Sequence, residues 1–476
     1  MQKKVVRTLA FALAGIMSLS VAGCGGKGSS TAANDYLKSR GEKVFDKYIE
    51  DEEVVDLKGY EFKIVDFNTH VWAPEVVEDE KNQLSLDIIE DVEKTFNCKI
   101  VVEFVSADKT FENAQPSIMA GDKYADLIGT TRWAYGQLLA GDLLADLSKI
   151  DDLDLSQDYF YQEVSDLMTF DGRTYAFSAD FDERNYTQFV MYFNKRIWDE
   201  LGLPDAYQLV RDGKWTWETC LEYANKALRD YDGNGVVDSA SDRWGMTAPS
   251  GDLVNAMYAS MEGTIFDKNQ YGALKLMTTE QTNAEKLAFM YKFFQQENVL
   301  YKRENEGYLD MFTQGKSLFL SMINAPGTEM RDMEDDWGIL PMPKWNEEQE
   351  KYACQVNHNT KIYSMSKTNK NTYEASIIIE ALARRFQSYK DMSMDEYETI
   401  MFRADEDIEM LENYILNNSY NEMFDNVRGA DTTLLKPYVI MTDACMYNKF
   451  SDINSEMLSI ENLVNVALDE FLNNLE

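Results

Sequence analysis

The sequence predicts an α/β protein of two domains, and three observations lead to this fold class. In the first half, β-rich segments alternate with segments of helical hydrophobic spacing, which is typical of βαβ units and mainly parallel sheets flanked by helices. In the second half, helical segments are more frequent. About 440 residues follow residue 35, too many for one typical hydrophobic core, so two domains are expected.

Residue spacing predicts the individual elements. Strands are expected where β-branched and aromatic residues dominate, at 62–67, 99–105 and 125–129. Helices are expected where apolar residues recur every three or four positions, at 86–96, 133–140, 216–228, 371–382, 394–417 and 455–475. Thr216 is placed to cap the third of these helices, because a threonine oxygen accepts from an unpaired N–H of the first turn.

The first 23 residues have the layout of a secretory signal peptide. Three basic residues precede an uncharged stretch at 8–22, which is shorter than the roughly 20 apolar residues of a spanning helix. The following VAGC resembles the bacterial lipobox, in which Cys24 receives a diacylglycerol and becomes the mature N-terminus. Acyl chains would hold the protein on the membrane through a flexible tether within 24–56. A plain signal peptide with an incidental cysteine is the alternative.

Charge and composition exclude several function classes. The chain has 83 acidic against 46 basic residues, a net charge of −37, which disfavours nucleic acid and other polyanions and favours cations. Two histidines are too few for a histidine-rich transition-metal site. The remaining cysteines have no CxxC spacing, and the sequence leaves open whether they pair or are buried thiols: Cys98, Cys220, Cys354 and Cys445.

Several segments, in order along the chain, resemble the bacterial extracellular solute-binding proteins of family 1, the maltose-binding-protein-like group. They are ADLI at 125–128, GDLLADL at 141–147, DGRTYA at 171–176, MYFNKR at 191–196, LGLP at 201–204, WTWE at 215–218, QGKSLFL at 314–320 and WGILPMP at 337–343. The chain departs from the family by an insertion at 205–214 and an acidic helical stretch at 391–430.

The resemblance implies a two-lobed, periplasmic-binding-protein-like fold of class II with a hinge of about three crossings, near residues 185–190, 318–323 and 385–390. Lobe 1 would comprise 57–188 and 323–388, and lobe 2 would comprise 189–322 and 389–476. Such proteins close around a ligand held between the lobes. The implied function is that of a monomeric, extracellular, lipid-anchored protein that carries a carbohydrate, an oligosaccharide in our interpretation, to the permease subunits of an ABC importer.

Candidate ligand-binding residues lie after strands, because open α/β sheets bind ligands at the carboxyl ends of their strands. A sugar site combines aromatic rings with polar side chains that fix hydroxyl groups. Trp72, Trp133 and Trp244 are the aromatic candidates, although each is also compatible with simple packing. The polar candidates are Arg132, Asp182, Glu183, Arg184 and Asn324.

Residues 230–238 follow the spacing D-x-[DN]-x-[DN]-G-x-x-D of a calcium loop. Side-chain oxygens at alternate positions, with one backbone carbonyl, suit a hard cation, and Gly235 allows the sharp turn. The twelfth position, where a calcium loop has its last carboxylate ligand, is Ser241. The sequence therefore leaves the identity of this ligand open, and Asp242, one residue later, is a substitute. The predicted Ca²⁺ ligands are Asp230, Asp232, Asn234, the carbonyl of Val236, Asp238 and Asp242. A metal-free polar turn is the alternative.

Two other function classes stay open. A secreted, lipid-anchored glycoside hydrolase would need two carboxylates flanking a glycosidic bond. A surface protein that uses the fold for binding without transport is the other. The chain has no G-x-S-x-G, H-E-x-x-H or P-loop motif, so no nucleotide chemistry is expected and no catalytic residue is assigned.

Overall fold

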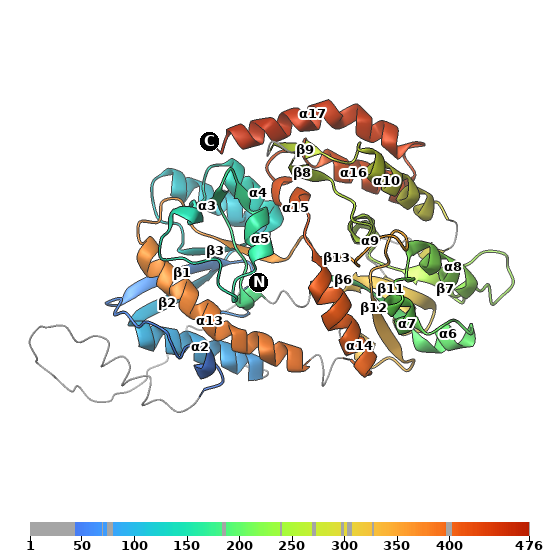
Figure 1. Cartoon of the computed structure of the whole chain (residues 1–476), viewed down its shortest axis with the longest axis horizontal. Coiled ribbons are helices and arrows are strands. Elements are labelled where there is room, and N and C mark those ends of the chain that lie inside the picture. The colour runs from blue at the N-terminus through green and yellow to red at the C-terminus, as the bar shows by residue number, and fades with distance from the viewer. Residues whose placement is uncertain are drawn as a thin grey trace, which may run out of the picture.

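The chain forms two α/β lobes, each built on its own sheet (Figure 1). The structure is a computed structural model that describes residues 43–68, 70–73, 80–182, 187–238, 240–268, 273–296, 299–301, 307–325, 328–396 and 402–475. The predicted signal peptide, 1–23, and Cys24 lie outside these residues. No helix among the described residues is both long and apolar enough to cross a membrane.

Lobe 1 contains a four-stranded sheet in the order β2-β1-β3-β14. The strands are β1 (Tyr60–Asp66), β2 (Cys98–Phe104), β3 (Leu127–Thr131) and β14 (Lys361–Ser364). The first three are parallel and β14 is antiparallel to β3. This agrees with the expected parallel arrangement, and the three strands lie within two residues of their predicted positions.

Helices cover both faces of the lobe 1 sheet. They are α2 (Glu80–Phe96), α3 (Thr110–Met119), α4 (Arg132–Ala140), α5 (Gln162–Leu167) and α13 (Thr372–Glu396), accompanied by a small hairpin of β4 (Thr169–Phe170) and β5 (Arg173–Thr174). α2 and α13 pack together over one hydrophobic cluster, while α3 and α4 pack over another. The predicted helices at 86–96 and 133–140 are therefore confirmed.

Lobe 2 contains a five-stranded sheet in the order β10-β7-β11-β6-β12. Its strands are β6 (Phe189–Asn194), β7 (Trp244–Thr247), β10 (Leu300–Tyr301), β11 (Ser317–Ile323) and β12 (Trp337–Pro341). β7 is parallel to β10 and β11, whereas β6 is antiparallel to both of its neighbours. This sheet is therefore mixed, and β8 (Phe266–Lys268) and β9 (Leu274–Leu276) form a separate hairpin.

The helices of lobe 2 surround the sheet and extend to the C-terminus. They are α6 (Lys195–Glu200), α7 (Ala206–Arg211), α8 (Trp217–Ala227), α9 (Ser250–Ser260), α10 (Gln281–Phe294), α11 (Tyr308–Thr313), α12 (Thr328–Arg331), α14 (Asp405–Glu409), α15 (Met423–Val427), α16 (Lys436–Tyr447) and α17 (Ile453–Asn473). Thr216 caps α8 by accepting from the N–H of Thr219, as predicted. Trp198, Trp217 and Trp337 are buried, and the last two donate their indole N–H to the hydroxyl of Ser260 and the carbonyl of Met330.

The connections between the lobes differ from the predicted boundaries. β6 starts lobe 2 directly after Gln188, within the segment 185–190 that was expected to cross between the lobes. The crossing near 318–323 is wrong, since β11 and β12 both pair with β6 and keep the chain in lobe 2 up to residue 356. The chain returns to lobe 1 between Asn357 and β14, and it leaves again after α13, later than the predicted 385–390. Lobe 1 therefore comprises about 43–188 and about 357–396. The flexible tether expected within 24–56 is wrong from residue 43 on, because Phe45 and Ile49 are buried in the cluster of α2 and α13, and Glu52 pairs with Arg385 at 2.7 Å.

Hydrogen bonds join the connecting segments side by side. The N–H of Asn324 donates to the carbonyl of Gln188 at 2.7 Å, and the N–H of Asn357 donates to the carbonyl of Thr187 at 2.8 Å. Gln188 also forms a bridge with Val356. These contacts define the hinge as a narrow ribbon of backbone between the two sheets.

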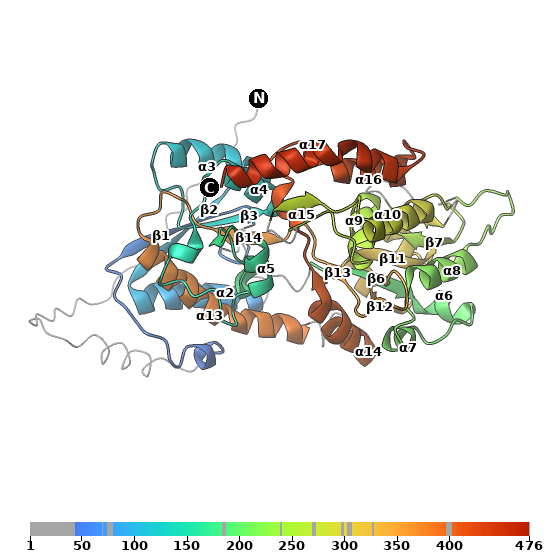
Figure 2. The same ribbon diagram turned by 45° about the horizontal axis from the view of Figure 1, so that its top comes forward.

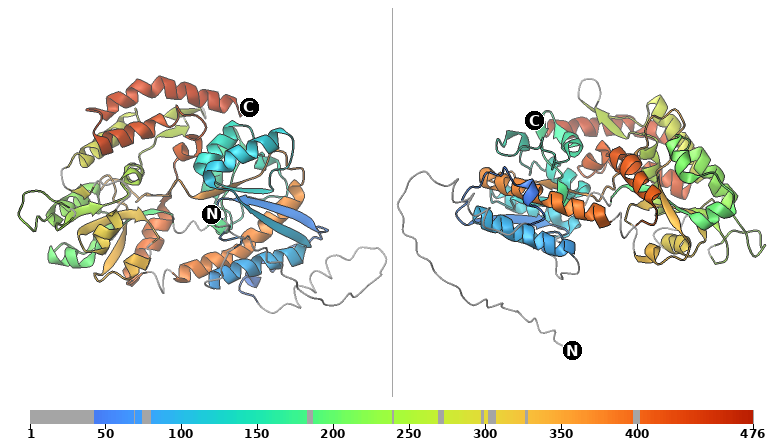
Figure 3. Two further views of the ribbon diagram at one scale, coloured as in Figure 1. Left: turned by 180° about the vertical axis from the view of Figure 1, so that it is seen from behind. Right: turned by 60° about the horizontal axis from the view of Figure 1, so that its bottom comes forward.

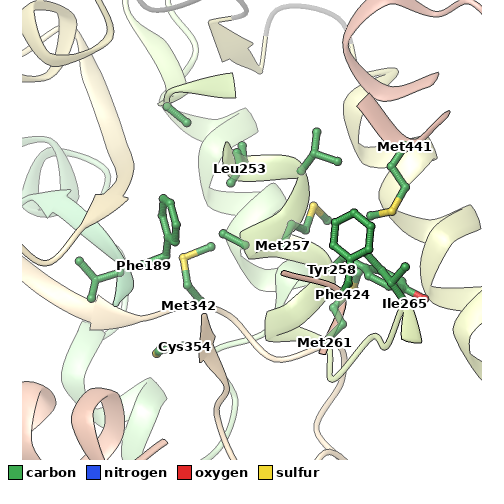
Figure 4. Packing of buried hydrophobic residues seen from close by; sticks show 14 of the residues in the cluster. Phe189, Leu253, Met257, Tyr258, Met261, Ile265, Met342, Cys354, Phe424 and Met441 are labelled. Atoms are coloured by element: carbon green, nitrogen blue, oxygen red, sulfur yellow. The ribbon is translucent and has the colours of Figure 1, made fainter. Parts of the chain in front are cut away.

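The C-terminal helices link the two lobes. α15 packs on α4 of lobe 1, and α16 packs on α9 and α10 of lobe 2. Figure 4 shows Leu253 and Met257 of α9, and Met261 directly after this helix, in one buried cluster with Phe424 of α15 and Met441 of α16. One hydrophobic cluster thus runs from the α3 and α4 face of lobe 1 into lobe 2.

α17 lies along the top of the molecule over both lobes (Figure 2). Near its end, the ring of Phe471 lies 5.6 Å from the ring of Phe170 in β4, measured between centroids. The guanidinium of Arg173 in β5 donates to the carbonyl of Leu475. The helix predicted at 455–475 is therefore confirmed, and its end is attached to lobe 1.

Two further expectations are resolved by the structure. The helix predicted at 394–417 is wrong as a single element: α13 ends at Glu396, and after a break the chain forms α14 followed by a π-helix at Met410–Ile415. Apolar spacing alone does not reveal where the hydrogen-bond ladder shifts. The four cysteines that the sequence left open, at 98, 220, 354 and 445, are buried thiols that form no disulfide with one another.

Candidate functional site

Asp66 organises the carboxyl end of β1. Its carboxylate accepts from the indole N–H of Trp72 at 2.8 Å and pairs with the ammonium of Lys361, the first residue of β14, at 2.8 Å. The ring of Trp72 packs among those of Phe181 and Phe386 and is 2% exposed. Trp72 thus lies in the core of lobe 1, and no ring face is open for the predicted stacking on a ligand. The reason is that the buried carboxylate of Asp66 accepts the indole N–H and holds Trp72 against the sheet.

Arg132 and Trp133 form the first turn of α4, at the carboxyl end of β3. The hydroxyl of Thr131 caps the helix by accepting from the N–H of Ala134, which fixes the direction of this turn. Arg132 is buried and its guanidinium donates to the side-chain carbonyl of Asn421. Trp133 is half-buried. Both residues therefore lie at a strand end, as the strand-end rule predicted, and Arg132 contacts the segment before α15.

Asp252 lies in the corresponding place in lobe 2, in the first turn of α9 after β7. It is half-buried, and burial raises the pKa of its carboxyl group, opposed by the charges of His358 and Arg428. His358 follows the hinge segment. Burial, assisted by the charge of Arg428, lowers the pKa of His358 below 6.5, so the imidazole is neutral at pH 7.

Arg428, at the C-terminal end of α15, connects these groups to α16. Its Nε lies 3.4 Å from a carboxylate oxygen of Asp425, and its guanidinium carbon lies 5.6 Å from the ring centroid of Tyr438. The charges of Asp252, Asp425, Arg132 and Arg428 all act on His358, so these side chains lie within electrostatic reach of one another. We name the central polar cluster by its members: Arg132, Asp252, His358, Asp425, Arg428 and Tyr438.

The central polar cluster has the composition of a site for a polar solute. Two guanidinium groups donate hydrogen bonds, two carboxylates accept them, and Tyr438 and the neighbouring Trp133 offer aromatic surface. The groups come from α4 in lobe 1, from α9 in lobe 2, from the hinge and from the C-terminal helices. A solute that contacted all of them would touch both lobes at once.

The other predicted ligand residues lie elsewhere. Trp244 begins β7, at the amino end of the strand, where its indole donates to the carbonyl of Asp238 at 3.1 Å and its ring packs on Tyr301. Asn324 is buried in the hinge. Asp182 ends a short 3₁₀ turn, and the remaining two, Glu183 and Arg184, lie outside the described residues.

Sequence reasoning missed five members of the cluster, and one of them is Tyr438 of α16. Asp252 has a usable signal, because it follows a strand by the same rule that selected Arg132. His358, Asp425 and Arg428 have no such signal, because the hinge and α15 reach the site through packing between distant parts of the chain.

The predicted calcium loop brings three carboxylates together. Oxygen atoms of Asp230, Asp232 and Asp242 lie within 4.8 Å of one another. Asp230 also accepts from the N–H groups of Gly233 and Gly235, at 2.6 and 2.8 Å, and both glycines have positive φ. Glycine is needed at these two positions because other residues rarely adopt a positive φ.

Other predicted ligands of the loop are arranged differently. Asp238 accepts from the N–H of Ala240 at 2.8 Å and of Ser241 at 3.2 Å, and it is not part of the carboxylate group. Backbone hydrogen bonds from Asp238 and Tyr231 lower the pKa of Asp242. Asp242, in the thirteenth position, is the acid that lies beside Asp230 and Asp232. The oxygen of Asn234 accepts from the N–H of Val236 at 2.7 Å.

Comparison with known proteins identifies the class. The sequence profile of the bacterial extracellular solute-binding proteins matches residues 78–386. The chain belongs to this family of extracellular solute-binding proteins. No curated protein sequence matches the chain.

Solved structures of solute-binding proteins share the fold. An ABC substrate-binding protein from Listeria monocytogenes, solved with cycloalternan, is 16% identical with a TM-score of 0.55, covering 87% of this chain and 100% of its own. The maltotriose-binding protein of Thermus thermophilus is 14% identical with a TM-score of 0.52, covering 87% and 100%. UgpB from Mycobacterium tuberculosis, solved with glycerophosphocholine, is 14% identical with a TM-score of 0.56, covering 86% and 98%.

Proposed function

We propose that this protein is the lipid-anchored, substrate-binding component of an ABC importer and that it captures a carbohydrate, of oligosaccharide size, between its lobes. Family membership supports the binding role. Several proteins of the same fold were solved with oligosaccharides, among them cycloalternan and maltotriose. The observation that carries the proposal is the central polar cluster, which draws its members from both lobes.

The cluster explains how a sugar would favour closure. Arg132 and Trp133 move with lobe 1, whereas Asp252 moves with lobe 2. A solute whose hydroxyl groups bond to Asp252 and Arg132 together, while its ring packs on Trp133, binds the closed arrangement more tightly than the open one. A ligand shifts a conformational equilibrium only through such a difference in affinity. The closed form would then be recognised by the permease subunits.

The experiment is calorimetric titration of residues 25–476, the protein without its signal peptide and Cys24, with maltose, maltotriose and cyclic oligosaccharides, preceded by a thermal-shift screen. A ligand of the native state raises its stability by RT ln(1 + [L]/Kd). Trp133→Ala should weaken binding about tenfold, since one lost aromatic contact costs about 1.4 kcal/mol. Trp345→Ala, another half-buried tryptophan, is the matched control and should bind normally. Equal losses in both variants would contradict the site.

The same titration separates binding from hydrolysis. A general acid in a glycosidase has a raised pKa, and Asp252 has this property. Each sugar is therefore recovered after overnight incubation and analysed by chromatography. Unchanged sugar supports a transport receptor, and cleaved product would replace the proposal with a glycoside hydrolase. Failure of every sugar to bind would indicate another solute class or a surface protein without a transport role.

Lipid attachment at Cys24 is a separate part of the proposal, supported by the VAGC sequence after an uncharged stretch. The expected location is the extracellular face of the cell membrane. Mass spectrometry of the mature N-terminus should find a diacylglyceryl group on Cys24. Cys24→Ser should release the protein into the medium, and retention of this variant on the membrane would contradict the anchor.

The last part of the proposal is that the loop at 230–242 binds a calcium ion. The three converging carboxylates of Asp230, Asp232 and Asp242 support a hard, oxygen-liganded cation. Millimolar Ca²⁺ should raise the melting temperature relative to chelator, and Asp242→Asn should remove most of this increase. Asp238→Asn should change it less, because Asp238 faces backbone N–H groups in the described loop. An increase that survives Asp242→Asn would contradict the site.

A further inference from the structure

A second groove lies between the lobes and shares no residue with the central polar cluster. It has a volume of about 510 Å³, which is within the usual range of about 300–1,000 Å³ for small-molecule sites. Lobe 1 contributes Tyr161 and the C-terminal part of α13, and the segment around the π-helix contributes the opposite wall. We call it the interlobe groove and define it by Tyr161, Gln188, Lys390, Met394, Glu412 and Ser419. Figure 3, right, brings the side with α13 and α14 forward.

Gln188, one of the residues that line this groove, has a buried side-chain oxygen, Oε1, that accepts no hydrogen bond within the described part of the chain. The residue is 2% exposed. Its amide orientation is fixed by its neighbours. The hydroxyl of Ser419 donates its one hydrogen to the carbonyl of Leu416 at 2.9 Å, so Ser419 accepts from the Nε2 of Gln188 at 3.1 Å. The oxygen of the amide is therefore the unsatisfied atom.

A buried acceptor without a partner costs roughly 1–3 kcal/mol, which a ligand that donates a hydrogen bond would recover. The charge around the groove indicates what kind of donor fits. Glu163 and Glu412 are exposed acids on opposite walls. The one lysine among the lining residues, Lys390, is already 3.1 Å from a carboxylate oxygen of Asp180 and 5.3 Å from the ring centroid of Tyr161.

We propose that the interlobe groove is a second binding site, for a small organic amine. Its ammonium group would donate to Oε1 of Gln188 and lie between the two acids, and its carbon chain would pack on Met394 and Leu416. An ammonium ion offers three donors and no acceptor, which suits walls on which carboxylate and amide oxygens predominate. The net charge of −37 raises the local concentration of such cations. The inference goes beyond the proposed function and does not depend on sugar binding.

The test is calorimetric titration with 1,4-diaminobutane in 0.15 M NaCl, with 1,4-butanediol as the neutral probe of the same length. We expect saturable binding of one diamine and at least tenfold weaker binding of the diol. Glu412→Gln should weaken diamine binding at least threefold. Glu406→Gln changes an exposed acid in α14 that does not line the groove; it removes the same charge and should leave the affinity unchanged.

Four results would overturn the proposal. The first is absence of saturable diamine binding, and the second is equal weakening by both variants, which would mean diffuse attraction to a negative surface. The third is equal affinity for the diol, which would mean that the groove does not select cations. The fourth is one-for-one displacement of the diamine by a bound sugar, which would move the amine to the central polar cluster. Loss of sugar binding in Trp133→Ala with intact diamine binding would support two separate sites.

Discussion

Glu422 gives the protein a pH-dependent stability that one substitution should remove. It is 5% exposed and caps α15, accepting from the backbone N–H of Phe424 at 2.9 Å and of Ile265 at 2.5 Å. Burial, with a smaller contribution from the charge of Asp425, raises the pKa of Glu422 from 4.5 to about 8. The folded state therefore keeps a proton that the unfolded state has lost between pH 4.5 and 8.

The sign and size follow from this difference. Because the folded state binds more protons than the unfolded state, stability decreases as the pH rises, by about 1.4 kcal/mol per pH unit for one group. Between pH 5 and pH 8 the loss attributable to Glu422 is about 4 kcal/mol. The contribution is fully present below pH 4.5 and is lost as the pH rises through 8.

Glu422→Gln removes the titration while keeping the shape of the side chain. Urea unfolding followed by tryptophan fluorescence at pH 5, 6, 7 and 8 gives the free energy of unfolding of both proteins. The free energy of unfolding of the native protein minus that of the variant should fall by about 4 kcal/mol from pH 5 to pH 8. Glu470→Gln, which removes an exposed acid in α17, is the control and should show a flat difference. A flat difference for Glu422→Gln as well would refute the reasoning.

Three further substitutions test the packing around the site. Gly429→Ala would place a Cβ 2.0 Å from the carbonyl oxygen of Trp133, so α15 must move. We expect the free energy of unfolding to fall by about 1–3 kcal/mol and solute binding to weaken. An unchanged melting temperature would contradict the contact. Asp66→Asn leaves the ammonium of Lys361 buried without its counter-charge, which should cost about 3–5 kcal/mol by urea unfolding; a loss below 1 kcal/mol would contradict this. Phe471→Ala should increase hydrogen exchange at the end of α17, and unchanged exchange would mean that the helix end is held by other contacts.

The local elements of the fold were predictable from the sequence, whereas the assignment of elements to lobes was not. Alternation of strands and helices located β1, β2 and β3 because each is a short apolar run between polar turns. The crossing expected at 318–323 was wrong because residue spacing identifies a strand but not its partner. β12 follows α12 in the chain and pairs with β6, and this pairing can be seen only in the folded sheet.

The candidate site was predictable only where the chain itself places a residue at a strand end. Arg132 and Trp133 satisfy that rule, and Asp252 satisfies it in lobe 2. Trp72 satisfies it as well, but the buried carboxylate of Asp66 draws its indole into the core. Arg428 reaches the site through the packing of α15 on α4, where Gly136 and Gly429 allow close approach. No local pattern encodes such a contact.

The end of α17 changes what kind of motion the lobes can make. The backbone ribbon at Gln188 holds the lobes together at one place, and the contacts of Phe471 and Leu475 with the β4–β5 hairpin hold them at another. A rotation of one lobe against the other that keeps both of these contacts has to take place about the line through them, and it would change the packing of α15 on α4. Sliding or twisting would break one of the two contacts. The end of α17 therefore limits the directions in which the lobes can move relative to each other.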